Sequence, residues 1–258
     1  MSNETVGKTL VVAFSVCLVC AIVVSTAAVA LRPLQAANIE SDKQTNILAA
    51  AGLLDDSMTV ADQFASVQVR AIDLDTGRYT DAIDPSTWDY LKAAKDPQIS
   101  SSFEELGTAD IAKIGRRENY AVVYLLEDES GQLDKVILPV RGYGLWSTLQ
   151  GFLALEEDLN TVAGIGFFAH TETPGLGGEV DNPEWKAKWV NKEAFADGEL
   201  ALQVIKGALA AGAPDMEHTI DGLSGATLTT VGVDNLIKFW LGENGYRPFL
   251  DNLKSGEA

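Results

Sequence analysis

The chain begins with a long apolar segment. Residues 9–31 read TLVVAFSVCLVCAIVVSTAAVAL and carry no charged side chain. A helix needs about 20 apolar residues to cross the hydrocarbon core of a bilayer, so this segment can span it. A cleaved signal peptide is the alternative, because AVA before Leu31 is typical of a cleavage site. The apolar run is longer than the roughly 7–15 residues of a signal core, which favours a retained membrane anchor.

After the apolar segment the pattern of hydrophobic positions changes twice. Beyond Pro33, apolar residues recur at helical spacing up to Gly52 and predict a membrane-proximal helix within residues 32–60. Strand-like alternation follows at 65–77, and a loop with short helical pieces is expected at 84–115. Two β-rich runs flank EDESGQ and predict a hairpin over 119–142. Further strands are expected within these ranges: 144–155, 161–170 and 200–207.

Two later segments predict helices. The stretch 182–195 starts with Asn182 as an N-cap and Pro183 at the first helical position. The stretch 233–245 is amphipathic and ends at glycine, with Pro248 beyond it. Hairpin-ordered strands with helices between and after them favour an α+β domain with a mainly antiparallel sheet, not alternating βαβ units.

Composition and charge narrow the classes of partner. Hydrophobic residues make up 47% of the chain and charged residues 22%, which suits a globular domain with a real core. The formal net charge of −18 repels phosphate backbones, so we expect no nucleic-acid partner. Both cysteines, Cys17 and Cys20, lie in the apolar segment. The two histidines, His170 and His218, lack paired ligand spacing, so we expect no metal site.

Four glycine-rich stretches carry candidate chemistry. GYGLWS and GIGFFA imitate a dinucleotide fingerprint, but Phe167, Phe168 and Pro174 favour a strand running into a turn over a helix start. HTETPGLGGEV, residues 170–180, forms a turn whose backbone can approach a flat ligand, with Leu176 able to cover one face of an aromatic ring. A plain wide turn is the alternative, and His170 beside it is expected to be an ordinary histidine.

The fourth stretch is DGLSGATLTT, residues 221–230, directly before a helical pattern. Ser224 is expected to be a helix N-cap. A helix start also offers unpaired N–H groups to a phosphate, with Gly225 and Ala226 leaving room and Thr227 supplying a hydroxyl. That hydroxyl is a weak nucleophile, so any ester here needs a separate transferase. The residues alone leave both alternatives open, a simple cap and a phosphate site.

Together these motifs resemble a known family. D-x-x-S-G-A-T, from Asp221 to Thr227, looks like the signal of the flavin transferase that esterifies FMN phosphate to threonine. RGYGLWST, ETPGLGGEV, NPEWKAKWV and DGLSGATLTTVGVDNLIKFWLG together resemble the C subunits of the Na⁺-translocating NADH:quinone oxidoreductases. The G subunits of Rnf complexes share the attachment motif, but the GLWS and NPEWKAKWV stretches favour the quinone reductase.

The resemblance implies a site and a place in the cell. Thr227 would carry FMN as a phosphoester, and the transferase would recognise Asp221, Ser224, Gly225, Ala226 and Thr227. Electrons would pass from NADH toward ubiquinone, coupled to sodium export, with other membrane subunits as partners. Charges near the span barely decide its orientation. The resemblance implies a cytoplasmic N-terminus at 1–8, a single inner-membrane span at 9–31, the membrane-proximal segment 32–60 and a periplasmic FMN-binding domain at 61–258.

The remaining hypotheses concern the residues that contact FMN and the functional class of the protein. Trp146, Glu172, Thr173, Leu176 and Gly177 are expected to contact FMN, together with Ser224, Gly225 and Ala226, while Lys206 would offset its charge. Trp146 is equally compatible with a core position, and Lys206 with plain solvation. A membrane-anchored scaffold in which SGAT is only a cap is the alternative from another class. Flavins store electrons themselves, which suits a chain without an evident catalytic acid, base or metal set.

Overall fold

The computed structural model describes residues 5–258 except 56, 129 and 211. The chain divides into two compact units, residues 1–43 and 44–258. Helix α1, Val6–Ala50, joins the two predicted helical segments and continues through Pro33, where the helix lacks one backbone donor. Of the predicted N-terminal segment 1–8, residues 1–4 lie outside the described residues.

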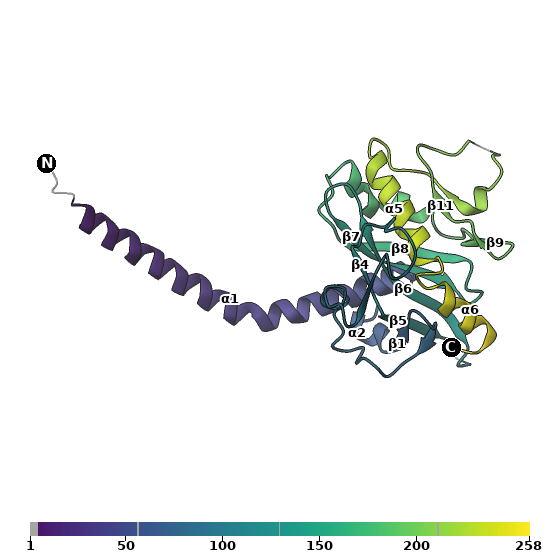
Figure 1. The fold of residues 1–258 in the computed structure, drawn as a ribbon, viewed down its shortest axis with the longest axis horizontal. Coiled ribbons are helices and arrows are strands. Elements are labelled where there is room, and N and C mark those ends of the chain that lie inside the picture. Colours follow the sequence, from purple (N-terminus) through teal and green to yellow (C-terminus); the bar gives the residue numbers. More distant parts are fainter. Residues whose placement is uncertain (1–4, 56, 129, 211) are drawn as a thin grey trace. The chain divides into compact units, whose positions relative to one another are not determined.

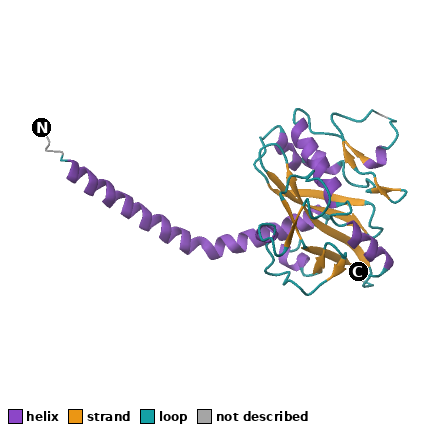
Figure 2. Cartoon of the chain, in the orientation of Figure 1, coloured by secondary structure: helices purple, strands orange, loops and turns teal. Residues whose placement is uncertain are grey.

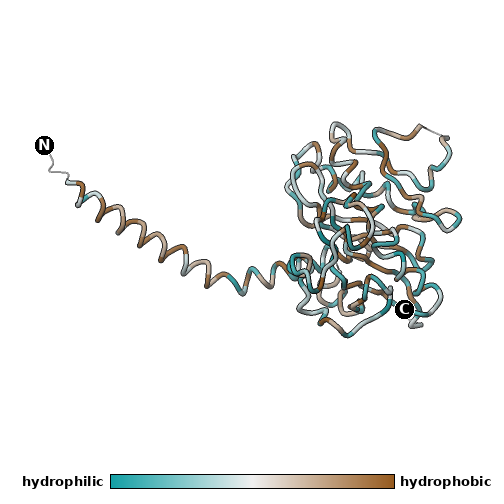
Figure 3. Tube along the Cα trace, in the orientation of Figure 1, coloured by the Kyte–Doolittle hydropathy of each residue, from teal (hydrophilic) through white to brown (hydrophobic). Residues whose placement is uncertain are grey.

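Helix α1 contains the only stretch in the described ranges that is long and apolar enough to cross a membrane. Figure 3 shows hydrophobic residues along its first part and more hydrophilic residues further on. The apolar side chains of this first part are exposed to the surroundings, as a helix surrounded by lipid requires. The helix is therefore consistent with an N-terminal membrane anchor.

A six-stranded antiparallel sheet forms the centre of the second unit (Figure 2). Its strand order is β2-β1-β5-β6-β7-β8, and consecutive strands from β5 to β8 are hairpin neighbours. The strands span Arg78–Tyr79 (β2), Val67–Asp73 (β1), Tyr120–Glu127 (β5), Leu133–Tyr143 (β6), Thr148–Glu156 (β7) and Val162–Ala169 (β8). The α+β class, the antiparallel sheet and the β5–β6 hairpin are confirmed; Glu129 of the predicted hairpin turn lies outside the described residues.

Alternation along the strands builds a separate core on each face of the sheet. On β6, Val136, Leu138 and Val140 enter the larger core, while Ile137 between them enters the smaller one. Helices α5, Thr227–Trp240, and α6, Arg247–Ser255, contribute to the larger core. Ile47, Leu48 and Ala50 at the end of α1 contribute to the smaller core. Each face of the sheet thus has its own helical cover.

The glycines of GIGFFA serve this packing. Both Gly164 and Gly166 lie inside β8, and a Cβ on Gly164 would come within 2.4 Å of the Ala50 carbonyl oxygen. The end of α1 can approach β8 only because this side chain is missing. The expectation of a strand in place of a dinucleotide fingerprint is confirmed.

Short elements connect the sheet to the site. The helix Pro183–Ala187 (α4) starts with Asn182 as its N-cap and Pro183 in its first turn, as predicted, but it ends at Ala187, so the extent expected over 182–195 is wrong. The single strand expected over 200–207 is wrong, because two short strands of different sheets, β10 and β11, occupy this range. The other short elements are α2 Val60–Phe64, α3 Tyr90–Ala93, β3 Ser100–Ser102, β4 Arg116–Glu118, η1 Gly177–Asp181, α4 Pro183–Ala187, β9 Phe195–Ala196, β10 Glu199–Leu200, β11 Gln203–Val204, η2 Met216–His218 and β12 Thr219–Ile220.

The C-terminal helices lie against the sheet. Helix α5 packs on β6 and β11 (Figure 1). It begins six residues before the helical pattern that the sequence indicated at residue 233, and α6 was not predicted as a helix. The N-terminus of α5 carries the threonines of the attachment motif, so this packing positions the candidate site.

Candidate functional site

The start of α5 differs from the prediction. Ser224 is not its N-cap: the cap residue is Ala226, whose side chain has no oxygen to offer, and the helix begins at Thr227. Gly225 has φ +71°, a conformation that favours glycine, and this turn leads the chain into the helix. The first intrahelical bond runs from the Thr230 N–H to the Ala226 carbonyl, so the N–H groups of residues 227–229 have no partner within the helix.

The three threonines of the stretch 221–230 have different environments. Thr227 is exposed, whereas Thr229 and Thr230 are buried. The Thr230 hydroxyl accepts from the Leu223 N–H and donates to the Ala226 carbonyl. The Thr229 hydroxyl donates to Glu172 at 2.8 Å. Only Thr227 among the three therefore presents a hydroxyl to solvent.

Glu172 is the centre of the site. Its side chain is buried, with 5% of the residue exposed. The Oε1 atom accepts from the N–H groups of three consecutive residues, 145, 146 and 147, at 2.9–3.1 Å. The Oε2 atom accepts from Thr229. Burial raises the pKa of Glu172, but the hydrogen bonds it accepts, led by that from the Trp146 N–H, outweigh burial and lower the pKa below its ordinary value.

Two glycines make room for this carboxylate. A Cβ on Gly144 would lie 2.7 Å from Glu172 Oε1. One on Gly177 would lie 2.6 Å from Oε2 and 2.5 Å from the Thr229 hydroxyl. All three distances are far shorter than van der Waals contact. The glycines of GYGLWS and of ETPGLGG are therefore needed for close packing around the Glu172 side chain.

Three exposed apolar side chains lie on segments that are connected to the start of α5. Trp146 is 65% exposed, Leu176 45% and Leu228 60%. Leu176 reaches the attachment turn, since a Cβ on Gly225 would lie 3.1 Å from Leu176 Cδ2. The core position considered for Trp146 is therefore wrong. The sequence analysis missed Leu228, although its place next to Thr227 in TLTT was the available signal.

Asp221 is held from several sides. Its carboxylate accepts from Lys188 Nζ at 2.8 Å and from the Leu209 N–H at 2.7 Å. Its carbonyl accepts from the Trp185 indole at 2.8 Å. The bond from Lys188, followed by that from Leu209, lowers the pKa of Asp221 below its ordinary value. The contact of the NPEWKAKWV segment with Asp221, through Trp185 and Lys188, was not predicted from the sequence.

Thr173 and Lys206 are the other predicted contact residues. Thr173 is exposed, and its carbonyl accepts the N–H groups of Leu176 and Gly178, which shapes the loop. Lys206 is exposed. The backbone of its neighbour Ile205 lies close to Gly222, because a Cβ added to Gly222 would be 2.3 Å from the Ile205 carbonyl oxygen. Lys206 therefore lies on a segment that packs against the attachment motif.

His170 has a structural role. Its Nδ1 accepts from the Glu172 N–H at 3.2 Å, and its Nε2 lies 2.8 Å from Asp181. These two contacts orient the beginning of the loop 170–180 and hold the backbone of Glu172. His218, the second histidine, is buried with its Nδ1 2.8 Å from the Glu193 carbonyl.

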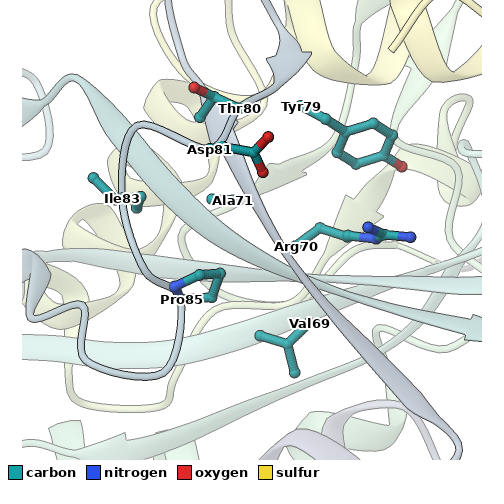
Figure 4. Close-up of a pocket in the computed structure, with 8 residues that line it drawn as sticks. All are labelled: Val69, Arg70, Ala71, Tyr79, Thr80, Asp81, Ile83 and Pro85. Atoms are coloured by element: carbon teal, nitrogen blue, oxygen red, sulfur yellow. The ribbon is translucent and has the colours of Figure 1, made fainter.

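Two other features lie apart from these residues. A pocket of about 360 Å³ lies beside β1 and β2, lined by Arg70, Tyr79, Asp81 and their neighbours (Figure 4). It contains no predicted site residue. Asp134, Glu156 and Glu157 form an acidic group, and the Lys135 ammonium already pairs with two of its three carboxylates, at 2.6 Å from Glu156 and 3.5 Å from Asp134.

The comparisons with known proteins match this geometry. The profile of the FMN-binding domain family matches residues 144–242, a range that begins at Gly144 and includes Glu172, the loop behind it and the start of α5. The second unit therefore contains an FMN-binding domain.

The full chain is also similar to whole proteins. It is 55% identical to the C subunit of the Na(+)-translocating NADH-quinone reductase of Pseudomonas aeruginosa, over 100% of this chain and 99% of the relative. Identity to the corresponding protein of Yersinia pestis is 45%, over 99% and 96%. The crystal structure of Shewanella oneidensis NqrC matches with TM-score 0.76 and 36% identity, over 84% of this chain and 99% of that one. The chain belongs to the NqrC family, the C subunits of the Na⁺-translocating NADH-quinone reductases.

Proposed function

We propose that the chain carries FMN as a phosphoester on the Thr227 hydroxyl and relays electrons from NADH toward ubiquinone within a sodium-exporting complex. The carrying observation is that Thr227 is the exposed threonine of the motif, at the first residue of α5 and beside the loop 172–178. FMN supplies reversible storage of one or two electrons when bound.

The start of α5 suits the phosphate. The N–H groups of residues 227–229 have no partner within the helix and lie at its positive dipole end. Gly225 and the small side chain of Ala226 keep bulk away from these donors. Ser224, exposed at the turn, can add a hydroxyl donor. These features support a phosphate seat that ends at the Thr227 oxygen.

The exposed apolar residues suit the flavin ring. Trp146, Leu176 and Leu228 are exposed apolar residues on three segments of the site. A flat aromatic ring that covers them removes apolar area from water, which stabilises binding by about 25 cal/mol per Å². Thr173 and Gly177 belong to the same loop, and Lys206 supplies a positive charge on the segment beside the motif. Glu172 would act from behind this surface through its bonds to the loop and helix.

The attachment requires a second protein. An ester bond forms between Thr227 Oγ1 and the phosphorus of a flavin phosphoanhydride that the transferase would bring. The anhydride bond breaks, and the phosphate on its far side leaves with the hydroxyl proton. No base contacts the exposed Thr227 hydroxyl among the described residues, so a flavin transferase would activate it. The motif Asp221–Thr227 would be its recognition sequence, with Asp221 presented in the fixed conformation that Lys188 and Trp185 impose.

The rest of the proposal concerns location and partners. The apolar helix over residues 9–31 would hold the chain in a bacterial inner membrane, with the N-terminus in the cytoplasm and the domain in the periplasm. The other membrane subunits of the complex would donate and accept the electrons. Membership of the NqrC family supports these assignments.

Mass spectrometry of the full chain tests the proposal. Chain co-produced with the transferase should gain one FMN less water, on the peptide that contains Thr227, and should fluoresce on a denaturing gel. Thr227→Ala should remove the adduct, whereas Thr227→Ser keeps the hydroxyl and should retain part of it. An adduct that persists in Thr227→Ala, or an unmodified wild-type chain beside an active transferase, would overturn the assignment.

A further inference from the structure

Glu172 is buried beside the proposed attachment site, yet direct contact with FMN does not account for its bonds. Both carboxylate oxygens accept from protein donors. Oε1 accepts from three backbone N–H groups and, at 3.5 Å, from the Ser147 hydroxyl, and Oε2 accepts from the Thr229 hydroxyl. Within the described part of the chain, every hydrogen-bond donor to this carboxylate is neutral. A buried anion stabilised only by neutral dipoles is costly unless its geometry is maintained.

Each oxygen holds a different segment. Oε1 fixes residues 145–147, which include the exposed Trp146. Oε2 fixes Thr229, two residues beyond Thr227 in the first turn of α5. The carboxylate therefore sets the spacing between the segment that presents the tryptophan and the helix turn that presents the acceptor hydroxyl. The missing side chains of Gly144 and Gly177 leave the space that this carboxylate occupies.

The charge has its own consequence. Glu172 is ionised at neutral pH and lies in a region shielded from water, where electrostatic interactions are stronger than at the surface. A fixed negative charge next to the first turn of α5 opposes the addition of an electron to a group attached there. It therefore lowers the reduction potential of that group.

We propose that Glu172 is a charged positioning residue: its carboxylate keeps Trp146 and the first turn of α5 in register for attachment at Thr227, and it lowers the potential of the attached flavin. The inference rests on the proposed function for its flavin readouts only. The positioning itself exists in the cofactor-free chain and can be measured there.

The test uses the full chain with Glu172→Gln, which removes the charge and nearly preserves the shape. Glu184→Gln, an exposed carboxyl in α4, is the matched control. In cofactor-free chain carrying Thr227→Ala, amide hydrogen exchange of residues 145–147 and 228–230 should be faster in Glu172→Gln than in the control. With the transferase, Glu172→Gln should slow attachment by about tenfold, because small displacements of an acceptor cost large factors in rate.

The potential separates charge from shape. The attached flavin should have a more positive midpoint potential in Glu172→Gln and an unchanged one in Glu184→Gln. Thr229→Val removes one bond but keeps the charge, so it should slow attachment and leave the potential within error of wild type. Thr229→Ser restores the hydroxyl and should recover the attachment rate. This pair carries the test if Glu172→Gln does not fold.

Unchanged exchange in the cofactor-free Glu172→Gln chain would overturn the positioning role, whatever the flavin does. A potential equal to that of the control would overturn the charge effect. A wild-type chain without flavin on Thr227 would overturn the proposed function instead, and the exchange result would still decide whether Glu172 positions the two segments.

Discussion

Two carboxylates hold the attachment motif, one on each side, and they do so by opposite means. Glu172 is 5% exposed and its donors are neutral. The Asp221 side chain is 27% exposed and pairs with Lys188, whose side chain is 46% exposed. Burial with dipoles makes the first site rigid and costly to disturb, whereas the second is a partly hydrated ion pair that salt and water can replace.

Replacing each carboxylate by alanine gives the largest expected contrast. Glu172→Ala leaves the N–H groups of residues 145–147 and the buried Thr229 hydroxyl without their acceptor, so we expect a loss of about 3 kcal/mol in the free energy of unfolding. Asp221→Ala exposes its donors to water and should cost about 1 kcal/mol. Denaturant unfolding of the unit from residue 44 onward, followed in the full chain, measures both losses. Equal losses would contradict the contrast between the two carboxylates.

Close packing around Glu172 can be broken without touching its charge. In Gly177→Ala the new Cβ would meet the Thr229 hydroxyl at 2.5 Å and Glu172 at 2.6 Å, which should cost about 2 kcal/mol. Gly178→Ala is the matched control, since its Cβ would be 3.2 Å from the Thr173 carbonyl and should cost about 1 kcal/mol or less. Thermal unfolding of the two variants in parallel checks the order; a reversed order counts against the tight packing.

Acid should release both carboxylates. The pKa of each lies below its ordinary value in the folded state, so each stabilises the fold fully above that ordinary value, 4.5 for Glu172 and 3.8 for Asp221. The stabilisation is lost as the pH falls from there through the lowered pKa. Glu172→Gln should therefore flatten the decline in stability that starts near pH 4.5. Unfolding curves recorded between pH 6 and pH 3, about one for each half unit of pH, measure the free energy of unfolding of both proteins. Identical pH profiles for wild type and Glu172→Gln would refute this prediction.

Salt gives the smallest effect and sharpens the comparison. Lys188→Met removes a partly exposed ion pair, so its cost should be about 0.5 kcal/mol at low salt and should vanish near 1 M, where screening acts within about 3 Å. The cost of Glu172→Gln should not change with salt, because its donors carry no net charge. A salt-dependent cost for Glu172→Gln would place a cation near that carboxylate.

Local patterns were sufficient for several elements. The strand alternation of residues 119–170, the cap and proline of α4 and the long apolar segment each depend on near neighbours in sequence, and each prediction is confirmed. The start of α5 was misplaced because Ser224 has the residue type of an N-cap, whereas the turn at Gly225 moves the helix start to Thr227. That turn lies close to Leu176, which is about fifty residues away in sequence.

The sequence by itself determined the membrane-length helix, the α+β class and the motifs that name the family, because hydrophobic period, turn residues and short signatures are local properties. It also singled out Thr227 through the attachment motif. Only the tertiary structure decided that Thr227 is exposed while Thr229 and Thr230 are buried, and that Glu172 is bonded to two segments at once. The physical reason is that burial and hydrogen-bond partners arise when distant segments meet, and no periodicity along the chain records which segments those are.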